Sequence, residues 1–167
     1  ALLTVLSQDY DRISHHGVRR SLLEQQASSI GLPLEKVFLT AKATNKEYEA
    51  KMRELLVRYK AQGVEAVVFG DIFLEDLRTY REERLSELGM KGIFPLWKND
   101  TSQLVQRFLE LGFKTILACI NPNKIDPSFA GRIIDDRFLA DFPPDVDPCG
   151  ENGEFHSFVY DGPIFKN

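Results

Sequence analysis

Residues 65–71, EAVVFGD, place an apolar run directly before a glycine and an aspartate. A short apolar run bounded by turn residues is typical of a buried strand. Helical patterns flank this run on both sides, over residues 45–62 and 74–88. A strand between two helices with short connections is the repeating unit of a parallel sheet that helices cover on both faces.

The same alternation continues outward in both directions from this unit. Further strands are predicted at 1–7, 34–39, 92–96, 114–120 and 154–160, and further helices at 16–30, 101–111 and 132–140. Helical patterns stop at Gly31, Gly63, Gly89 and Gly112, and glycine is the residue favoured at a left-handed helix C-cap. We therefore predict an α/β fold with a parallel sheet over residues 1–120. The Pro-, Asp- and Gly-rich residues 121–167 form a smaller C-terminal subdomain.

Composition and charge narrow the function classes. The chain has 167 residues, 43% of them hydrophobic and 28% charged, which is typical of a globular domain with its own core. The net charge of −4 does not supply the basic surface of a general nucleic-acid binder. No apolar run reaches membrane-spanning length, and the apolar N-terminus lacks the pattern of a signal peptide. We expect no nucleic-acid or membrane partner.

The two cysteines, Cys119 and Cys149, have no zinc-binding spacing, so the sequence predicts no zinc site, and no residue is assigned as a metal ligand. Their small number favours a reducing cytoplasm. The sequence leaves open whether the protein forms a homodimer.

Two arginines lie on or beside the apolar stripe of the helix predicted at 74–88. Arg81 falls in the middle of the stripe, between Leu77 and Leu85, and Arg84 lies at its edge. An unpaired charge is costly to bury, so Arg81 needs an anionic partner. One interpretation is an ion pair with an acid such as Asp71. The other is that both arginines hold phosphate or carboxylate groups of a ligand.

The helix predicted at 16–30 raises a similar question. Arg19 falls in its first turn, just beyond the strand at 1–7, where the helix dipole and the guanidinium would both favour an anion. The alternative is that Arg19 bends outward to solvent. Ser14 and His16 precede the helix, and capping of its free N–H groups is the structural interpretation of both.

Gly70 and Asp71 follow the central strand, at the sheet edge where α/β proteins bind ligands. A glycine here allows close approach of the backbone to a ligand. Asp71 is placed to meet a metal ion, a ribose or an amine, or to cap the next helix.

The C-terminal segment 147–158 sets two glycines and two glutamates directly before an aromatic strand. Glu151 or Glu154 is suited to bind magnesium or to accept protons from an amine. A solvated surface turn is the alternative for a Glu-Asn-Gly triplet.

Several segments resemble the diphthine–ammonia ligase family of PP-loop ATP pyrophosphatases. They occur in the family's order along nearly the whole chain: 14–20, SHHGVRR; 69–72, FGDI, with 80–84, YREER; 94–97, FPLW, with Asp100; 126–132, DPSFAGR; and 150–163, GENGEFHSFVYDGP. The resemblance implies a Rossmann-like adenine nucleotide α-hydrolase fold and cleavage of ATP, with Mg²⁺, between its α- and β-phosphates. A carboxylate of a small molecule or protein would be activated as an acyl-adenylate and attacked by ammonia.

The resemblance also suggests roles for the candidate residues. Residues 1–120 would bind the nucleotide, and residues 121–167 would lie on the substrate side. The catalytic candidates are Glu151 and Glu154. The substrate-binding candidates are Tyr80, Arg81, Arg84, Gly150, Asn152, Gly153 and His156. The nucleotide-binding candidates are Ser7, His16, Arg19, Gly70 and Asp71.

Two departures from the family pattern affect these expectations. The family begins with a strand and a Ser-Gly-Gly-x-Asp-Ser loop that wraps pyrophosphate. No such loop occurs in this sequence, and residue 1 corresponds to the family's second strand. We expect poor ATP binding by a chain without that loop. His156 stands where the archaeal and eukaryotic pattern has a glutamate. The loss of that negative charge favours a different substrate, and the chain as a whole resembles the bacterial branch of the family. A nucleotide-binding sensor without turnover, and a scaffold with structural arginine pairs, are the alternatives to a ligase.

Overall fold

The computed structural model describes residues 1–14 and 16–166, so His15 of the first family-like segment lies outside the described residues. Helices and strands alternate along the chain, and the predicted α/β class is confirmed. The prediction of one parallel sheet over residues 1–120 was wrong for its last strand, because Lys114–Ile120 pairs antiparallel with Phe155–Asp161. The chain packs as two compact units. Unit 1 comprises Ala1–Lys42 and Thr101–Asn167, and unit 2 comprises Ala43–Asp100.

The N-terminal part of unit 1 is a three-stranded sheet with the order β2-β1-β3. Strand β1 (Leu2–Ser7) pairs in parallel with β3 (Leu34–Leu39) and antiparallel with the short β2 (Arg12–Ile13). Helix α1 (Arg20–Ile30) connects β2 to β3 and ends at Gly31, which has a φ of 76°. A left-handed φ strongly favours glycine, so the sequence signal for this helix end was correct.

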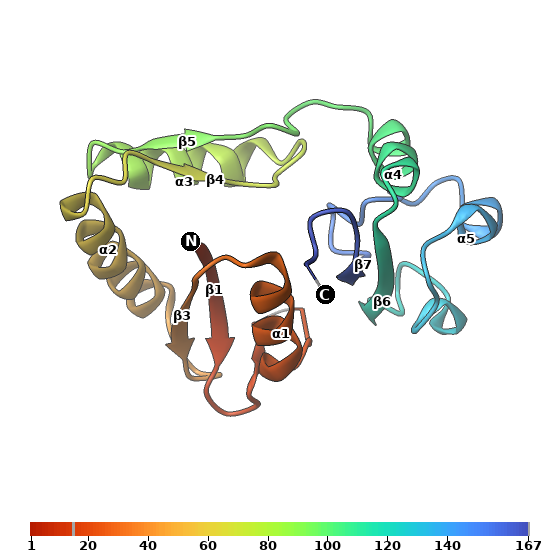
Figure 1. The fold of residues 1–167 in the computed structure, drawn as a ribbon, viewed down its shortest axis with the longest axis horizontal. Helices are drawn as coiled ribbons and strands as arrows, with labels where there is room; N and C mark the ends of the chain where they lie inside the picture. Colours follow the sequence, from red (N-terminus) through yellow and green to blue (C-terminus); the bar gives the residue numbers. More distant parts are fainter. Residues whose placement is uncertain (15, 167) are drawn as a thin grey trace. The chain divides into compact units, whose positions relative to one another are not determined.

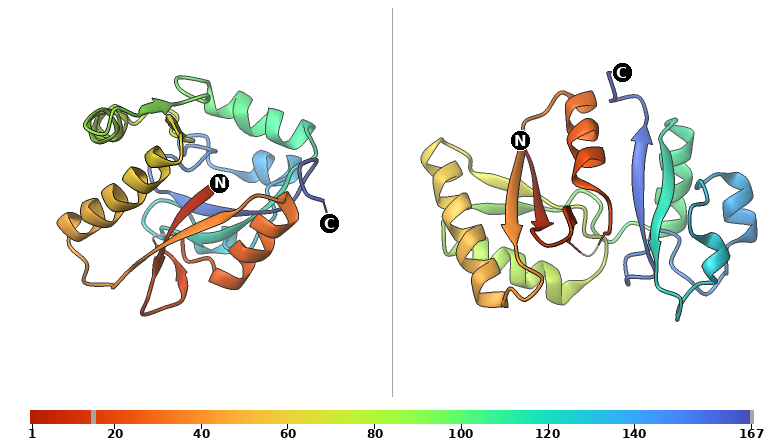
Figure 2. Two further views of the ribbon diagram at one scale, coloured as in Figure 1. Left: turned by 60° about the vertical axis from the view of Figure 1, so that its left-hand side comes forward. Right: turned by 90° about the horizontal axis from the view of Figure 1, so that it is seen from below.

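The C-terminal part of unit 1 is a two-stranded antiparallel sheet with two helices. Strand β6 (Lys114–Ile120) pairs with β7 (Phe155–Asp161), and Figure 2 shows the two strands side by side. Helix α4 (Thr101–Glu110), the 3₁₀ turn η1 (Pro127–Phe129) and helix α5 (Asp136–Asp141) complete this part. Its core is an apolar cluster formed by Val105, Leu117, Ile125, Phe129, Ile134, Phe138 and Phe155.

Hydrogen bonds between described residues join the two parts of unit 1. The Gln26 side chain on α1 donates to the carbonyl of Val159 on β7 at 2.6 Å. Near the C-terminus, the Lys166 N–H donates to the Ser29 carbonyl at 2.7 Å. Segments far apart in the sequence therefore meet within one unit.

Unit 2 contains two helices and a parallel strand pair. Helix α2 (Asn45–Ala61) begins with a capping box between Thr44 and Glu47, which satisfies two free N–H groups. Strand β4 (Ala66–Val68) pairs in parallel with β5 (Lys91–Ile93), and α3 (Glu75–Ser86) runs along this pair in Figure 1. Leu85, Leu88 and Met90 form the centre of its core.

The prediction for residues 16–19 was wrong. Helix α1 begins only at Arg20, and Arg19 is its N-cap in extended conformation. Gly17 has a φ of 71°, and β2 forms a hairpin with the end of β1 that the sequence analysis missed. Arg19 is therefore exposed ahead of the helix instead of lying in an inward stripe. Its own side chain makes no capping hydrogen bond.

Smaller differences concern the C-terminal part and the boundaries between parts. The helix predicted at 132–140 covers only Asp136–Asp141, because Asp135 caps it with a bond from the Phe138 N–H. The boundary predicted at residue 120 divides the nucleotide-binding residues 1–120 from the substrate-side residues 121–167, and this division of roles stays a prediction. In the structure, β6 before this boundary and β7 after it pair in one sheet. None of the helices in the described part of the chain is long and apolar enough to span a membrane.

Candidate functional site

The loop before β7 holds a buried carboxyl group. The Glu154 side chain is only 6% exposed. Its Oε1 accepts a hydrogen bond from the Asn152 side chain at 3.1 Å, while its Oε2 is buried and has no hydrogen-bond partner among the described residues. Glu154 is thus not the solvated acid of a simple surface turn, and that alternative is wrong for this residue. Buried polar atoms without partners are rare in proteins, so this atom calls for an explanation.

Asp147, which the sequence analysis did not single out, fixes the same loop. Its carboxylate accepts the N–H groups of Glu151 at 2.7 Å and of Cys149 at 3.2 Å. Its carbonyl accepts the N–H of Gly150, which has a left-handed φ of 70°. The signal that identifies Asp147 is its place at the start of an Asp-Pro-Cys-Gly turn, where an aspartate side chain binds backbone groups two residues on.

Gly150 and Gly153 have different surroundings. A Cβ atom on Gly150 would lie 2.9 Å from the carbonyl oxygen of Phe155, so this glycine is required by packing. A Cβ atom on Gly153 would meet no other atom within 4 Å. The backbone next to Glu154 therefore borders open space.

His16 and His156 meet within unit 1. Their ring centroids are 4.3 Å apart, with the rings tilted by 38°. His16 precedes α1 and was predicted on the nucleotide side, whereas His156 lies on β7 and was predicted on the substrate side. The fold therefore brings residues from these two predicted groups into contact.

In unit 2, Asp71 and Arg81 form a charged pair. Arg81 Nε lies 2.9 Å from Asp71 Oδ2, and its Nη2 lies 3.3 Å from Oδ1. Asp71 is 9% exposed, and the guanidinium also lies over the Phe69 ring, 4.4 Å from its centroid. Of the two interpretations of Arg81, the structure contains the ion pair with Asp71. Asp71 does not cap α3, whose N-cap is Leu74.

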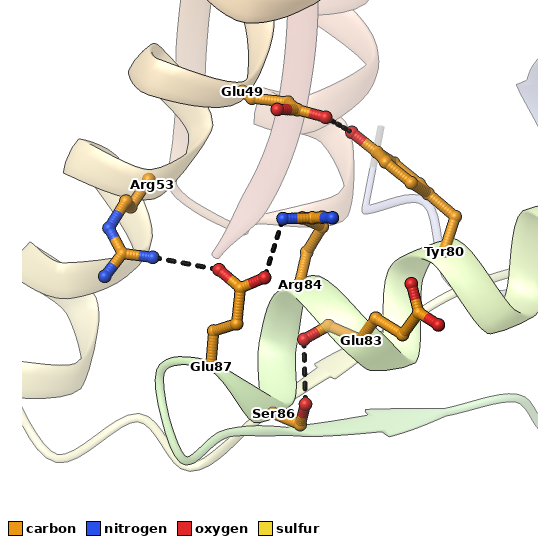
Figure 3. A network of polar contacts seen from close by, with 7 residues as sticks. All are labelled: Glu49, Arg53, Tyr80, Glu83, Arg84, Ser86 and Glu87. Atoms are coloured by element: carbon orange, nitrogen blue, oxygen red, sulfur yellow. Dashed lines mark hydrogen bonds and ion pairs between the residues drawn. The ribbon is translucent and has the colours of Figure 1, made fainter.

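Arg84 and Tyr80 belong to a network between α2 and α3 (Figure 3). Glu87 accepts from Arg84 at 2.6 Å through one oxygen and from Arg53 at 3.1 Å through the other. The Tyr80 hydroxyl donates to Glu49 at 3.0 Å. Burial, followed by this hydrogen bond, raises the pKa of Tyr80 to about 12. Glu49 and Arg53 of α2 and Glu87 at the end of α3 were not identified from the sequence, because nothing in either helix marks which of its charges face the other.

A third arginine of α3, Arg78, contacts the family-like segment 94–97. The Arg78 guanidinium lies over the rings of Phe94 and Trp97, 4.8 Å and 4.6 Å from their centroids. Phe94 in turn stacks on Phe69 at 5.2 Å. Cation–π contacts of this kind hold a loop segment against a helix, so residues 94–97 are anchored to α3.

The remaining nucleotide-side candidates lie in separate units. Ser7 ends β1 in unit 1, and its hydroxyl is buried without a hydrogen-bond partner in the described residues. Gly70 follows β4 in unit 2, and a Cβ atom there would have open space around it. The convergence of Arg81 with the loop 150–154, which the predicted site requires, stays a prediction.

Within the described residues, no group of three or more His, Cys, Asp and Glu side chains is arranged to hold a metal ion. One pocket in unit 1 lies beside α4 and α5, and it contains none of the predicted site residues. Its lining residues are Ser102, Val105, Gln106, Leu139, Phe142, Pro143, Pro144, Val146 and Pro148.

Comparison with known proteins gives consistent matches along the chain. Residues 1–92 match the diphthamide synthase N-terminal domain, and residues 100–167 match the diphthamide synthase C-terminal domain. The chain is 25% identical over 173 residues to diphthine–ammonia ligase of Schizosaccharomyces pombe, covering 95% of this chain and 28% of that protein. It is 27% identical over 192 residues to the enzyme of the same name from Saccharomyces cerevisiae, covering 96% and 28%.

A mammalian relative is more distant in sequence but closer in length. The chain is 23% identical over 172 residues to the diphthine–ammonia ligase of Bos taurus, covering 94% of this chain and 62% of that protein. The chain thus spans just over a quarter of the two yeast relatives and less than two thirds of the bovine one.

Proposed function

Because the chain belongs to the diphthamide synthase family, we propose that it carries nucleotide and substrate binding for an ATP-dependent carbon–nitrogen ligase. The reaction is of the diphthine–ammonia ligase type. The observation that carries this proposal is the match of both family domains, in order, over residues 1–92 and 100–167. The aligned relatives are named diphthine–ammonia ligases, so diphthine and ammonia are the first substrates to test.

The proposed chemistry proceeds through an acyl-adenylate. A carboxylate is a poor acyl donor at neutral pH, because its leaving group would be an oxide. Attack of the carboxylate on the α-phosphorus of ATP releases pyrophosphate and converts that oxygen into part of AMP, a good leaving group. Ammonia then forms the C–N bond while the C–O bond to AMP breaks.

The substrate-side roles are assigned to the loop before β7. Glu151 and Glu154 are the proposed acid–base residues, and Gly150, Asn152, Gly153 and His156 line the acceptor side. The hydrogen bonds that the Asp147 carboxylate accepts from this loop support a catalytic role, because catalytic side chains must be held in place by a rigid backbone. The contact between His156 and His16 places one residue of the proposed acceptor side next to one residue of the proposed nucleotide side.

The nucleotide-side roles are assigned to Ser7, His16, Arg19, Gly70 and Asp71, with Arg81, Arg84 and Tyr80 binding phosphate or substrate carboxylate. Arg81 and Asp71 hold each other, so a ligand contact of either residue requires exchange of that pair. Both Asp71 oxygens face Arg81, so direct binding of magnesium by Asp71 would compete with the ion pair. Mg²⁺ is therefore assigned to the MgATP substrate, coordinated by phosphate oxygens.

Three further expectations belong to the same proposal. The fold would be Rossmann-like, of the adenine nucleotide α-hydrolase type, and the parallel pairing of β1 with β3 and of β4 with β5, each within its own small sheet, supports this. Residues 1–120 would serve the nucleotide and 121–167 the acceptor. The use of two cysteines, both free thiols in the structure, supports a cytoplasmic location.

Product analysis tests the proposal. The protein is incubated with MgATP, ammonium and a diphthine-containing peptide, and nucleotides and peptide are separated. The expected result is AMP and pyrophosphate in equal amounts, with conversion of the peptide carboxylate to an amide by mass spectrometry. ADP and phosphate as products would overturn the proposal. Tight binding of ATP or AMP without turnover would instead assign the chain to the nucleotide-sensor class.

A further inference from the structure

Glu154 combines deep burial with an incomplete set of hydrogen bonds. Its side chain has one oxygen bonded to Asn152 and one oxygen with no partner in the described part of the chain. An unsatisfied carboxyl oxygen away from water costs free energy unless some group donates to it. The Glu154 backbone carbonyl accepts the Asn121 N–H at 2.8 Å. No described residue donates to the second carboxyl oxygen, so this position is open to a donor from a bound ligand.

The backbone next to Glu154 borders open space on one side, and hydrogen bonds hold the loop in place. Space beside Gly153, the preceding residue, is open, whereas Phe155 fills the space at Gly150. Asp147 fixes the loop from within through two N–H groups, and the Lys124 ammonium binds the Asn152 carbonyl at 2.7 Å. The carboxyl group is thus positioned before any ligand arrives, which lowers the cost of binding.

The surroundings favour a small N–H donor over a metal ion. Magnesium requires near-octahedral coordination by oxygen ligands, and no cluster of acidic or histidine side chains suited to a metal is found in the described residues. A single carboxylate oxygen without a partner favours a positively charged N–H donor, because hydrogen bonds between charged groups are stronger than those between neutral groups.

Resting on the proposed ligase function, we propose that Glu154 binds the nitrogen donor as ammonium and removes its proton. Ammonium has no lone pair, so it must lose a proton before it attacks. The proton passes to the Glu154 carboxylate, which leaves NH₃ and a neutral carboxyl group. The nitrogen lone pair then attacks the acyl carbon, the C–O bond to AMP breaks with its electron pair, and the second proton leaves to solvent.

Ammonium binding is measured first on the wild-type protein with NH₄Cl as the probe. Glutamate is labelled at the side-chain carboxyl carbon, and the Glu154 signal is assigned by its loss in Glu154→Gln. We expect a saturable shift of that signal with NH₄Cl and none with tetramethylammonium chloride, which has no N–H groups, at equal ionic strength. Equal shifts with both salts, or no shift, would leave only a buried water at this oxygen and overturn the inference.

Kinetics then separate this role from the ligase function itself. In Glu154→Gln we expect pyrophosphate release with the carboxylate substrate to persist, while amide formation falls by about 10²-fold or more, as for loss of a general base. Glu110→Gln on α4, an exposed carboxylate, is the matched control and should behave as wild type. Unchanged amide formation in Glu154→Gln overturns the role of Glu154. Absence of pyrophosphate release by the wild type overturns the ligase function instead. Circular dichroism verifies folding, and the wild-type titration decides if the variant does not fold.

Discussion

The imidazole rings of His16 and His156 lie in contact, with centroids 4.3 Å apart. One ring precedes α1 and the other projects from β7, so the contact joins the two ends of the chain within unit 1. The interaction energy between the two rings contributes to the stability of the fold, and removal of either ring abolishes it.

A double-mutant cycle measures this contact. For His16→Ala, His156→Ala and the double variant, we expect a coupling free energy of about 0.5–1.5 kcal/mol, the range for aromatic pairs. The free energy of unfolding is obtained from urea titrations at a pH where imidazole is neutral. Additive effects of the two substitutions would show that the rings do not interact in solution.

The Asp71–Arg81 pair predicts an asymmetric response to substitution. Arg81→Leu alone leaves the buried Asp71 carboxylate without its partner and should lower the free energy of unfolding by about 3 kcal/mol. Combining it with Asp71→Leu should recover most of that loss, because an apolar pair replaces a charged one. Urea denaturation provides the measurement.

Arg84→Leu is the control for that experiment. Arg84 and Glu87 are both substantially exposed, and exposed ion pairs contribute about 0–1 kcal/mol. A loss in Arg81→Leu no larger than in Arg84→Leu would contradict a structural role for the Asp71–Arg81 pair.

Much of the fold could be predicted from the sequence, because its elements carry local signals. The strand at Leu34–Leu39 and the helix ending before Gly31 follow from apolar runs and glycine caps. The start of α1 could not be predicted, since residues 16–19 continue the helical pattern while Gly17 and the β2 hairpin divert the backbone. Tertiary hydrogen bonding there prevails over local propensity.

The candidate site was predictable in its residue types but not in its contacts. The segment around Glu154 was identified, yet neither its burial nor the role of Asp147 follows from spacing. For Arg81, the stripe on the helix required a buried partner but could not distinguish Asp71 from a ligand anion. That choice depends on how β4 and α3 pack, which is a tertiary property.

The hydrogen bond between Tyr80 and Glu49 predicts a stability change at high pH. Burial and this bond raise the pKa of Tyr80 from 10.0 to about 12. The folded state therefore retains the phenol proton more strongly than the unfolded state. This contribution is complete below pH 10 and is lost as the pH rises toward 12.

Tyr80→Phe isolates that effect. Urea unfolding of the wild type at several pH values between these limits should show a falling free energy, and the variant should show a smaller fall. Difference absorbance of wild type minus variant should place the Tyr80 ionisation near pH 12. Ionisation of Tyr80 near its ordinary pKa would contradict the bond to Glu49.

The two loop glycines predict different effects of added side chains. Gly150→Ala places a Cβ 2.9 Å from the Phe155 carbonyl oxygen and should destabilise by clash as well as by its left-handed φ. Gly153→Ala meets open space, so only the conformational cost of about 1–2 kcal/mol should remain. Thermal unfolding of both variants checks the order, and equal losses would contradict the described packing of the loop.

The proposed ligase function depends on formation of an acyl-adenylate by this protein. Exchange of radiolabelled pyrophosphate into ATP, with the diphthine-containing peptide present and ammonium omitted, tests that step without the later chemistry. The account predicts label in ATP only when the peptide carboxylate is present. Amide formation from peptide, ammonium and ATP without any such exchange would contradict it.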